Sequence, residues 1–259
     1  MTSESESQSE MPKLNPPQVS RLRYARNFIK TTVCEVRFPI VLELESKPPA
    51  KLQKRLKKAY PFYEMRSEFN LAQSPGSNER HVYVLQSKKK DWTVQIKSDS
   101  IILETTRYVD FEDFLTRFTE VLETSSDLMD TDFFTRVGFR YINEIPLADG
   151  KPEGWINPLL HSIIDSKVLG TVALEQHEFR GLTDFGGYMW RHGPRLDEVS
   201  NTPADKSVNY VMDFDYWAEN SDVADVLPFL KYANEINFYF FHWCLGQKAL
   251  DWMGEATPK

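Results

Sequence analysis

Two carboxylates and two guanidinium groups are the side chains whose spacing points most directly to chemistry. Asp213 and Asp215 stand two residues apart in a strand-like run, and side chains at that spacing project from the same face of a strand. Paired carboxylates can hold a divalent cation such as Mg²⁺. Arg136 and Arg140 share one face of another strand-like run. The aspartates therefore either bind a metal ion or neutralise Arg136, Arg140 or Arg37 across a sheet.

Other residue types that carry catalysis lack a catalytic spacing. Cys34 and Cys244 are the only cysteines, and Cys34 falls on the apolar side of its strand, where cysteine acts as a small hydrophobe. The histidines show no zinc-ligand spacing, and there is no glycine-rich phosphate loop or serine elbow. We therefore expect no catalytic residue, cofactor or metal, and we interpret Asp213 and Asp215 as structural. A metal-dependent enzyme built on them stays open as a third hypothesis.

Length, charge and cysteine content indicate a folded protein of a reducing compartment. The chain has 259 residues, a net charge of -7 and 41% apolar residues. Two cysteines are too few for a disulfide framework. The N-terminus has neither the basic start nor the apolar core of a signal peptide, and the run Phe238–Leu245 is too short to span a membrane. We expect a cytoplasmic protein that does not enter membranes.

Charge is distributed unevenly along the chain. Residues 47–97 contain twelve Lys or Arg against four Asp or Glu, a net charge of +8, so the remainder carries -15. A helix face and a lysine-rich turn within this segment could meet an anion, a nucleic acid backbone or an acidic protein. The residues of this candidate basic face are Lys51, Lys54, Arg55, Lys58, Lys88, Lys89 and Lys90.

The first half reads as a strand, a helix, four strands and a long helix. The first strand is predicted over Thr32–Glu45, with Pro39 at an edge or bulge. Pro48 and Pro49 open a helix that Pro61 ends. Asp110 is a good N-cap for the long helix, whose apolar residues fall on one face. The four intervening strands are predicted at Tyr63–Leu71, Arg80–Gln86, Trp92–Lys97 and Ile101–Tyr108.

The second half begins with the stretch Arg136–Ile145, in which Val137, Phe139 and Tyr141 project to one side and the two arginines to the other. Side chains of arginine are rarely buried without a partner, so acidic residues are expected on neighbouring strands. A helix is predicted at Pro158–Ser166 and a closing helix from about Asp225. Three strands are predicted between them at Thr171–Arg180, Gly187–Leu196 and Val208–Trp217.

The two halves follow a similar order, and Val36-Arg37-Phe38 resembles Phe139-Arg140-Tyr141. We predict an internal duplication: an α+β fold of two β-α-β(3-4)-α units that form a curved antiparallel sheet backed by helices. This order resembles TATA-binding-protein-like or helix-grip folds. Residues 1–24 are expected to form a disordered tail rich in Ser, Glu and Pro. The halves are expected at 25–130 and 131–259 within one compact unit.

The stretch Arg136–Asn143, Arg-Val-Gly-Phe-Arg-Tyr-Ile-Asn, also resembles the central strand signature of a sporadically distributed bacterial protein family of unknown function. Three further stretches agree with that resemblance: Glu35–Phe38, Tyr108–Phe114 and Met212–Tyr216. The resemblance covers roughly residues 30–245. It implies an accessory or defence-associated role in bacteria, and it supplies no activity, cofactor or catalytic residue.

The sequence favours a non-enzymatic protein-binding or adaptor protein. This hypothesis rests on the absent catalytic motifs, the basic segment and the acidic tail, with the basic face attracting an acidic protein partner. The alternative is a nucleic-acid-binding protein that uses the same lysines, although no RNA-binding strand motif or helix-turn-helix is visible.

Overall fold

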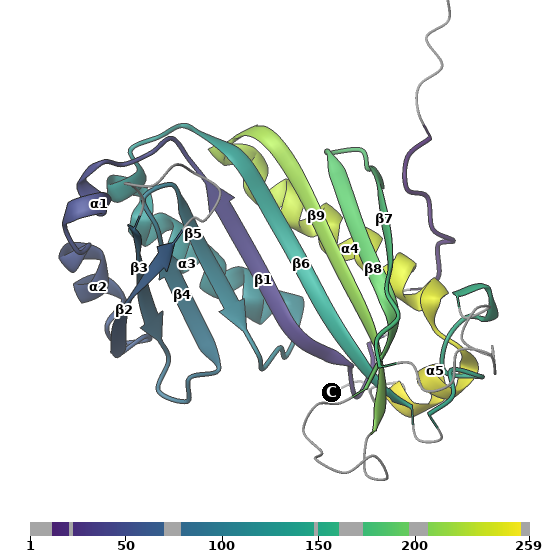
Figure 1. Cartoon of the computed structure of the whole chain (residues 1–259). Helices are drawn as coiled ribbons and strands as arrows, with labels where there is room; N and C mark the ends of the chain where they lie inside the picture. Colours follow the sequence, from purple (N-terminus) through teal and green to yellow (C-terminus); the bar gives the residue numbers. More distant parts are fainter. Residues whose placement is uncertain are drawn as a thin grey trace, which may run out of the picture.

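The computed structural model describes residues 12–20, 23–69, 79–147, 150–160, 173–196 and 207–254. Its centre is a curved antiparallel sheet with strand order β2-β3-β4-β5-β1-β6-β9-β8-β7 (Figure 1). The strands are β1 (Ile29–Arg37), β2 (Phe62–Phe69), β3 (Glu79–Gln86), β4 (Trp92–Ile96), β5 (Ser100–Thr105), β6 (Phe133–Leu147), β7 (His177–Leu182), β8 (Gly187–Leu196) and β9 (Val208–Asp222).

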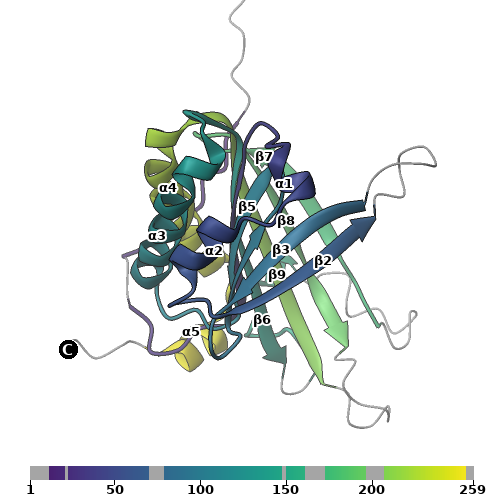
Figure 2. The same ribbon diagram turned by 90° about the vertical axis from the view of Figure 1, so that its left-hand side faces the viewer.

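Helices cover one face of this sheet. The two long helices α3 and α4 lie side by side there, while the opposite face, called the open face below, carries no helix of the described residues (Figure 2). None of the helices within the described ranges is long and apolar enough to cross a membrane. The helices are α1 (Glu43–Ser46), α2 (Ala50–Leu56), α3 (Phe111–Met129), α4 (Val226–Cys244) and α5 (Gln247–Met253).

Strand β6 lies in the middle of the sheet and pairs with β1 on one side and β9 on the other. The alternation along β6 decides what each face carries. Val137 and Phe139 are fully buried beneath the helices, and the Phe139 ring lies 5.5 Å from that of Phe114 in α3. Burying such side chains is the main driving force for placing α3 on this face.

The predicted α+β fold, a curved antiparallel sheet backed by helices, is confirmed. Helix α3 begins as expected, because the Asp110 carboxylate accepts a hydrogen bond of 2.8 Å from the Asp113 backbone N–H. The first strand was predicted too long. It ends at Arg37, since Pro39 lacks an N–H for the ladder, and the chain then turns until Glu43–Ser46 forms α1.

Several predicted elements fall partly outside the described residues. Of the helix expected at Pro158–Ser166, only the 3₁₀ turn Pro158–Leu160 is described. The strand expected from Thr171 is seen as β7 from His177 onwards. The short helix α5 was not predicted from the sequence. Within the expected tail, residues 12–20 are described, and the Leu14 N–H donates a 2.8 Å hydrogen bond to the Leu182 carbonyl.

Candidate functional site

Ion pairs join β6, β9 and β8 across the open face. Arg140 donates two hydrogen bonds to the carboxylate of Asp213, from Nε at 2.6 Å and from Nη2 at 2.7 Å. Arg191 of β8 lies 3.6 Å from the same carboxylate. Fork-shaped pairing of this kind is stronger and more directional than a single charged contact. These three residues and the charged side chains beside them are called the open-face ion-pair network below. Its members are Glu35, Arg37, Arg136, Arg140, Arg191, Asp213 and Asp215.

Arg136 links β6 to both of its neighbours. Its guanidinium donates to Glu35 of β1 at 3.0 Å and to Asp215 of β9 at 3.1 Å. To reach both, the side chain lies across Gly138, where a Cβ would stand only 2.4 Å from Nη1 of Arg136. Gly138 therefore leaves the space that the guanidinium occupies, with the Trp217 ring centre 5.5 Å from the guanidinium carbon.

Both aspartates lie on the open face, and the contacts favour a structural role for them. Asp213 is only 6% exposed, and guanidinium groups supply the positive charge that a metal ion would otherwise bring. Burial raises the pKa of Asp215, an effect that Arg136 and Arg140 oppose. The fifth member of the predicted cluster, Arg37, pairs instead with Glu35 at 3.0 Å. Among the described residues, no group of three His, Cys, Asp or Glu could hold a metal ion.

The predicted basic face is divided between two clefts on the helix side. Arg55 of α2 reaches α3, where it pairs with Asp127 at 2.9 Å. This pair lines a cleft of about 420 Å³ that Lys51 also borders. Arg55 is therefore engaged within the molecule, whereas Lys51 and Lys54 have no ion pair with the described residues.

The lysine turn lies beside the C-terminal end of α2. Lys88 and Lys89, together with Ala59, line a second cleft of about 500 Å³, and Lys90 Nζ lies 5.8 Å from the centre of the Phe62 ring. The carboxylate of Asp113 in this cleft is paired with Arg117 at 3.1 Å. The structure thus brings the turn close to the end of α2 near Lys58, and all these lysines are exposed.

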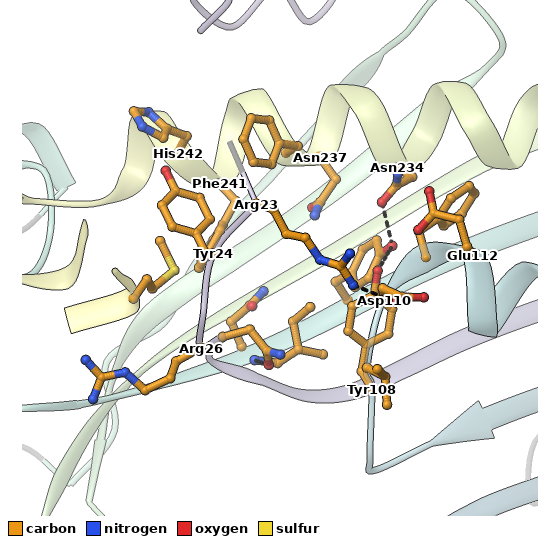
Figure 3. Close-up of a pocket in the computed structure, with 18 residues that line it drawn as sticks. Arg23, Tyr24, Arg26, Tyr108, Asp110, Glu112, Asn234, Asn237, Phe241 and His242 are labelled. Carbon is orange, nitrogen blue, oxygen red and sulfur yellow. Dashed lines mark hydrogen bonds and ion pairs between the residues drawn. The ribbon is translucent and has the colours of Figure 1, made fainter. Parts of the chain in front are cut away.

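Sequence reasoning missed a cavity of about 430 Å³ between α3, α4 and β6. Figure 3 shows its polar lining, with Asn234 and Asn237 descending from α4 and Arg23 facing Asp110. Tyr141 of β6 donates a 2.9 Å hydrogen bond to Asn234 Oδ1, and Arg23 pairs with Asp110 at 3.1 Å. The signal in the sequence was Asn143, a polar residue in register with the apolar side of β6.

A cluster of aromatic and titratable groups was also missed because its members come from distant segments. The rings of His177 and His192 face each other across β7 and β8 at 5.1 Å. His192 Nδ1 lies 2.6 Å from the Tyr210 hydroxyl, which donates to the Leu160 carbonyl at 3.0 Å. Burial, aided by the charge of His177, lowers the pKa of His192 to about 4. At neutral pH His192 is therefore an uncharged part of the core.

Comparison of the chain with profiles of known protein families and with curated proteins finds no match to either. The side chains therefore carry the functional argument. The open-face ion-pair network is neutralised within the fold, and the lysines of α2 and of the 88–90 turn are exposed. The cavity under the two helices combines polar groups with aromatic side chains.

Changing Asp213 to Asn distinguishes a structural carboxylate from a metal ligand. We expect Asp213→Asn to lower the free energy of unfolding by about 1–3 kcal/mol, because Arg140 and Arg191 lose a mostly buried charge partner. Denaturant unfolding measures this loss. The control Asp99→Asn removes an exposed pair with Arg80 and should cost at most about 1 kcal/mol. An Asp213→Asn protein of unchanged stability would contradict the structural role.

His192 makes stability depend on pH. Its pKa is lower in the folded state than the ordinary 6.5, so the unfolded chain binds the additional proton. The contribution of His192 to the free energy of unfolding is therefore fully present above about pH 6.5. It falls by about 2–3 kcal/mol as the pH drops toward about 4. His192→Phe should flatten this part of the profile, as measured by urea unfolding at several pH values. An unchanged slope in the variant would assign the pH dependence to other groups.

Proposed function

We propose that the protein is a non-enzymatic protein-binding protein that takes an acidic protein partner on its basic face. The observation that carries this proposal is the charge left uncompensated there. Five lysines of this face are exposed and have no ion pair with the described residues. They are Lys51, Lys54 and Lys58 of α2 and its C-terminal end, and Lys88 and Lys89 of the turn. Unpaired charge of one sign attracts a partner of the opposite sign and accelerates the encounter.

The open face supports the same conclusion by contrast. Arg136, Arg140 and Arg191 each have a carboxylate at 4.0 Å or closer, so the face presents paired charge of both signs. A nucleic acid would need a continuous row of unpaired cations along a sheet or groove. Such a row does not run over this part of the described sheet, which argues against a nucleic acid there.

A nucleic-acid-binding protein is the alternative for the basic face itself, because Lys88 and Lys89 suit phosphate as well as carboxylate. Two observations favour a protein. Arg55, the arginine of the set, is engaged with Asp127, and carboxylates such as Asp91 and Asp113 border the lysine turn. Asp113 is paired with Arg117 and Asp91 with Arg107, so neutral ion pairs interrupt the row of cations. A protein surface can place its acidic groups selectively against the lysines, whereas a phosphate backbone carries evenly spaced charge.

We also infer that the halves arose by duplication. In each half the first strand pairs with the last, β1 with β5 and β6 with β9. The sequence match makes Arg37 of β1 equivalent to Arg140 of β6, and therefore Glu35 equivalent to Gly138. These two equivalent residues lie directly opposite each other in the antiparallel pairing of β1 with β6, which is where a local twofold axis between the halves would pass. Two long helices side by side on one face favour the TATA-binding-protein-like alternative over a helix-grip arrangement. The proposed boundary at residues 130 and 131 falls between α3 and β6.

The accessory or defence-associated role in bacteria, and the cytoplasmic location, remain part of this proposal. The role rests on the family resemblance of the stretch Arg136–Asn143, and the location rests on the cysteine content. Binding a partner without catalysis is consistent with both.

Charge reversal on the basic face tests the proposed function. We expect Lys54→Glu/Lys58→Glu/Lys88→Glu to abolish co-purification of the partner from the native host, because three attractive charges become repulsive. Arg55 is left intact, since its reversal would also break the contact with Asp127. The melting temperature should stay within about 2 °C of the wild-type value, because exposed substitutions cost little.

The matched control is Lys231→Glu/Lys248→Glu, two exposed lysines of α4 and α5, which should retain the partner. Purification is followed by mass spectrometry, with and without nuclease. A partner retained by the triple variant would contradict the proposal. Loss of all co-purified protein after nuclease would instead favour the nucleic-acid alternative.

A further inference from the structure

The cavity beneath α3 and α4 contains a side chain whose hydrogen-bonding groups are unused. Asn143 is 1% exposed and lines the cavity. Both its Nδ2 and its Oδ1 are buried and have no hydrogen-bond partner among the described residues. Leaving a buried polar group unpaired is destabilising, so a residue kept in this condition calls for an explanation.

Two further carboxamides line the same cavity from α4. Their side-chain oxygens are engaged: Asn234 Oδ1 accepts from Tyr141, and Asn237 Oδ1 accepts from Tyr216 at 3.4 Å. Each amide nitrogen therefore keeps N–H donors for another group. In Figure 3 the nitrogen of Asn237 points from α4 toward the strands. Together with Asn143, these groups offer several donors and one acceptor within a single cavity.

The walls of the cavity are aromatic and its charges balance. Arg23 and Arg26 line it on one side and Asp110 and Glu112 on the other, so the lining favours neither a cation nor an anion. Burial lowers the pKa of His242, which favours the uncharged form of that ring. Flat side chains suit a flat ligand. The Tyr and Phe residues of the lining are Tyr24, Tyr108, Phe111, Tyr141, Phe238 and Phe241.

We propose that this cavity binds a small, uncharged, planar molecule that presents a hydrogen-bond donor and acceptor side by side, as a primary amide or a lactam ring does. Both carboxamide atoms of Asn143 are buried in the free protein, so the ligand displaces the side chains that cover them. The carboxamide then pairs with that edge, accepting through Oδ1 and donating through Nδ2. The aromatic side chains cover the faces of the ring. The volume of about 430 Å³ lies within the range of small-molecule sites.

Planar probes test this site on the full-length protein. Nicotinamide, uracil and 2-pyridone carry the required edge, whereas nicotinate and benzoate replace it with a carboxylate. At about 10 mM, at least one of the first three should raise the melting temperature by about 2–4 °C, the shift expected for a Kd near 1 mM. Nicotinate and benzoate should leave it unchanged. A response to none of the three, or an equal response to the carboxylates, overturns the proposal.

Asn143→Leu separates binding from folding. The variant should lose the probe-induced shift, while its own melting temperature equals or exceeds the wild-type value, because an apolar group of similar size replaces an unpaired amide. The matched control is Asn157→Leu. Both ends of its amide are engaged, Nδ2 with the Trp243 carbonyl at 2.9 Å and Oδ1 with the Leu159 N–H at 3.1 Å, so this variant should be less stable yet keep the shift. A shift that persists in Asn143→Leu places the binding elsewhere and overturns the proposal.

A crystal structure of the wild-type protein with the stabilising probe decides the matter even if Asn143→Leu does not fold. The proposal expects the amide or lactam edge of the probe within hydrogen-bond distance of both Asn143 side-chain atoms. Ordered water on both atoms, with the probe absent from the cavity, would show a hydrated structural asparagine and overturn the proposal.

Discussion

The pairing of the β6 arginines with carboxylates is the interaction on which the rest of the fold depends. A strand at the centre of a sheet carries Arg136 and Arg140 on one face, and neither guanidinium is fully exposed to water. Removing such groups from water is costly unless each finds a charged acceptor. Glu35 supplies one from β1, while Asp213 and Asp215 supply the others from β9. The ion pairs therefore hold β6 to both neighbours at once.

The other face of the same strand changes character along its length. Val137 and Phe139 complete the apolar core under α3. Two residues further on, Tyr141 pairs with Asn234, and the Asn143 side chain lines the cavity with no hydrogen-bond partner among the described residues. Side chains two residues apart share a face of a strand. The packing of Val137 and Phe139 under α3 therefore also places Asn143 on the helix-covered face of the sheet. The open-face ion-pair network thus positions the cavity from the opposite side of the sheet.

Much of this arrangement was predictable from local sequence patterns. The alternation in β6 gave its two faces, the N-cap Asp110 marked the start of α3, and two unpaired arginines required acidic neighbours. What the sequence did not reveal depends on contacts between distant segments. Nothing near Arg55 indicates that it reaches Asp127, and the cavity needs residues from the segment before β1, from α3, β6 and α4 together.

Local patterns also predicted the first strand too long, because a proline interrupts the sheet there. The run after Arg37 has strand-like residues, yet Pro39 interrupts the ladder, and the Val41 N–H instead donates to the Ser98 carbonyl at 2.7 Å. The groups that surround the Asn143 side chain could not be predicted from the strand pattern for a related reason. Whether a polar residue on a core face meets a partner, water or a ligand depends on helices that pack there from the other end of the chain.

Native-state hydrogen exchange tests the central role of β6 most directly. The backbone amides of Phe139 and Tyr141 should exchange only through global unfolding, with a free energy equal to that from denaturant melts. The amides of β2 and β7, which lie at the edges of the sheet and carry more exposed ion pairs, should open at a lower free energy. Exchange in β6 that is as easy as in β2 or β7 would contradict the account, because the paired arginines would then not hold the sheet together.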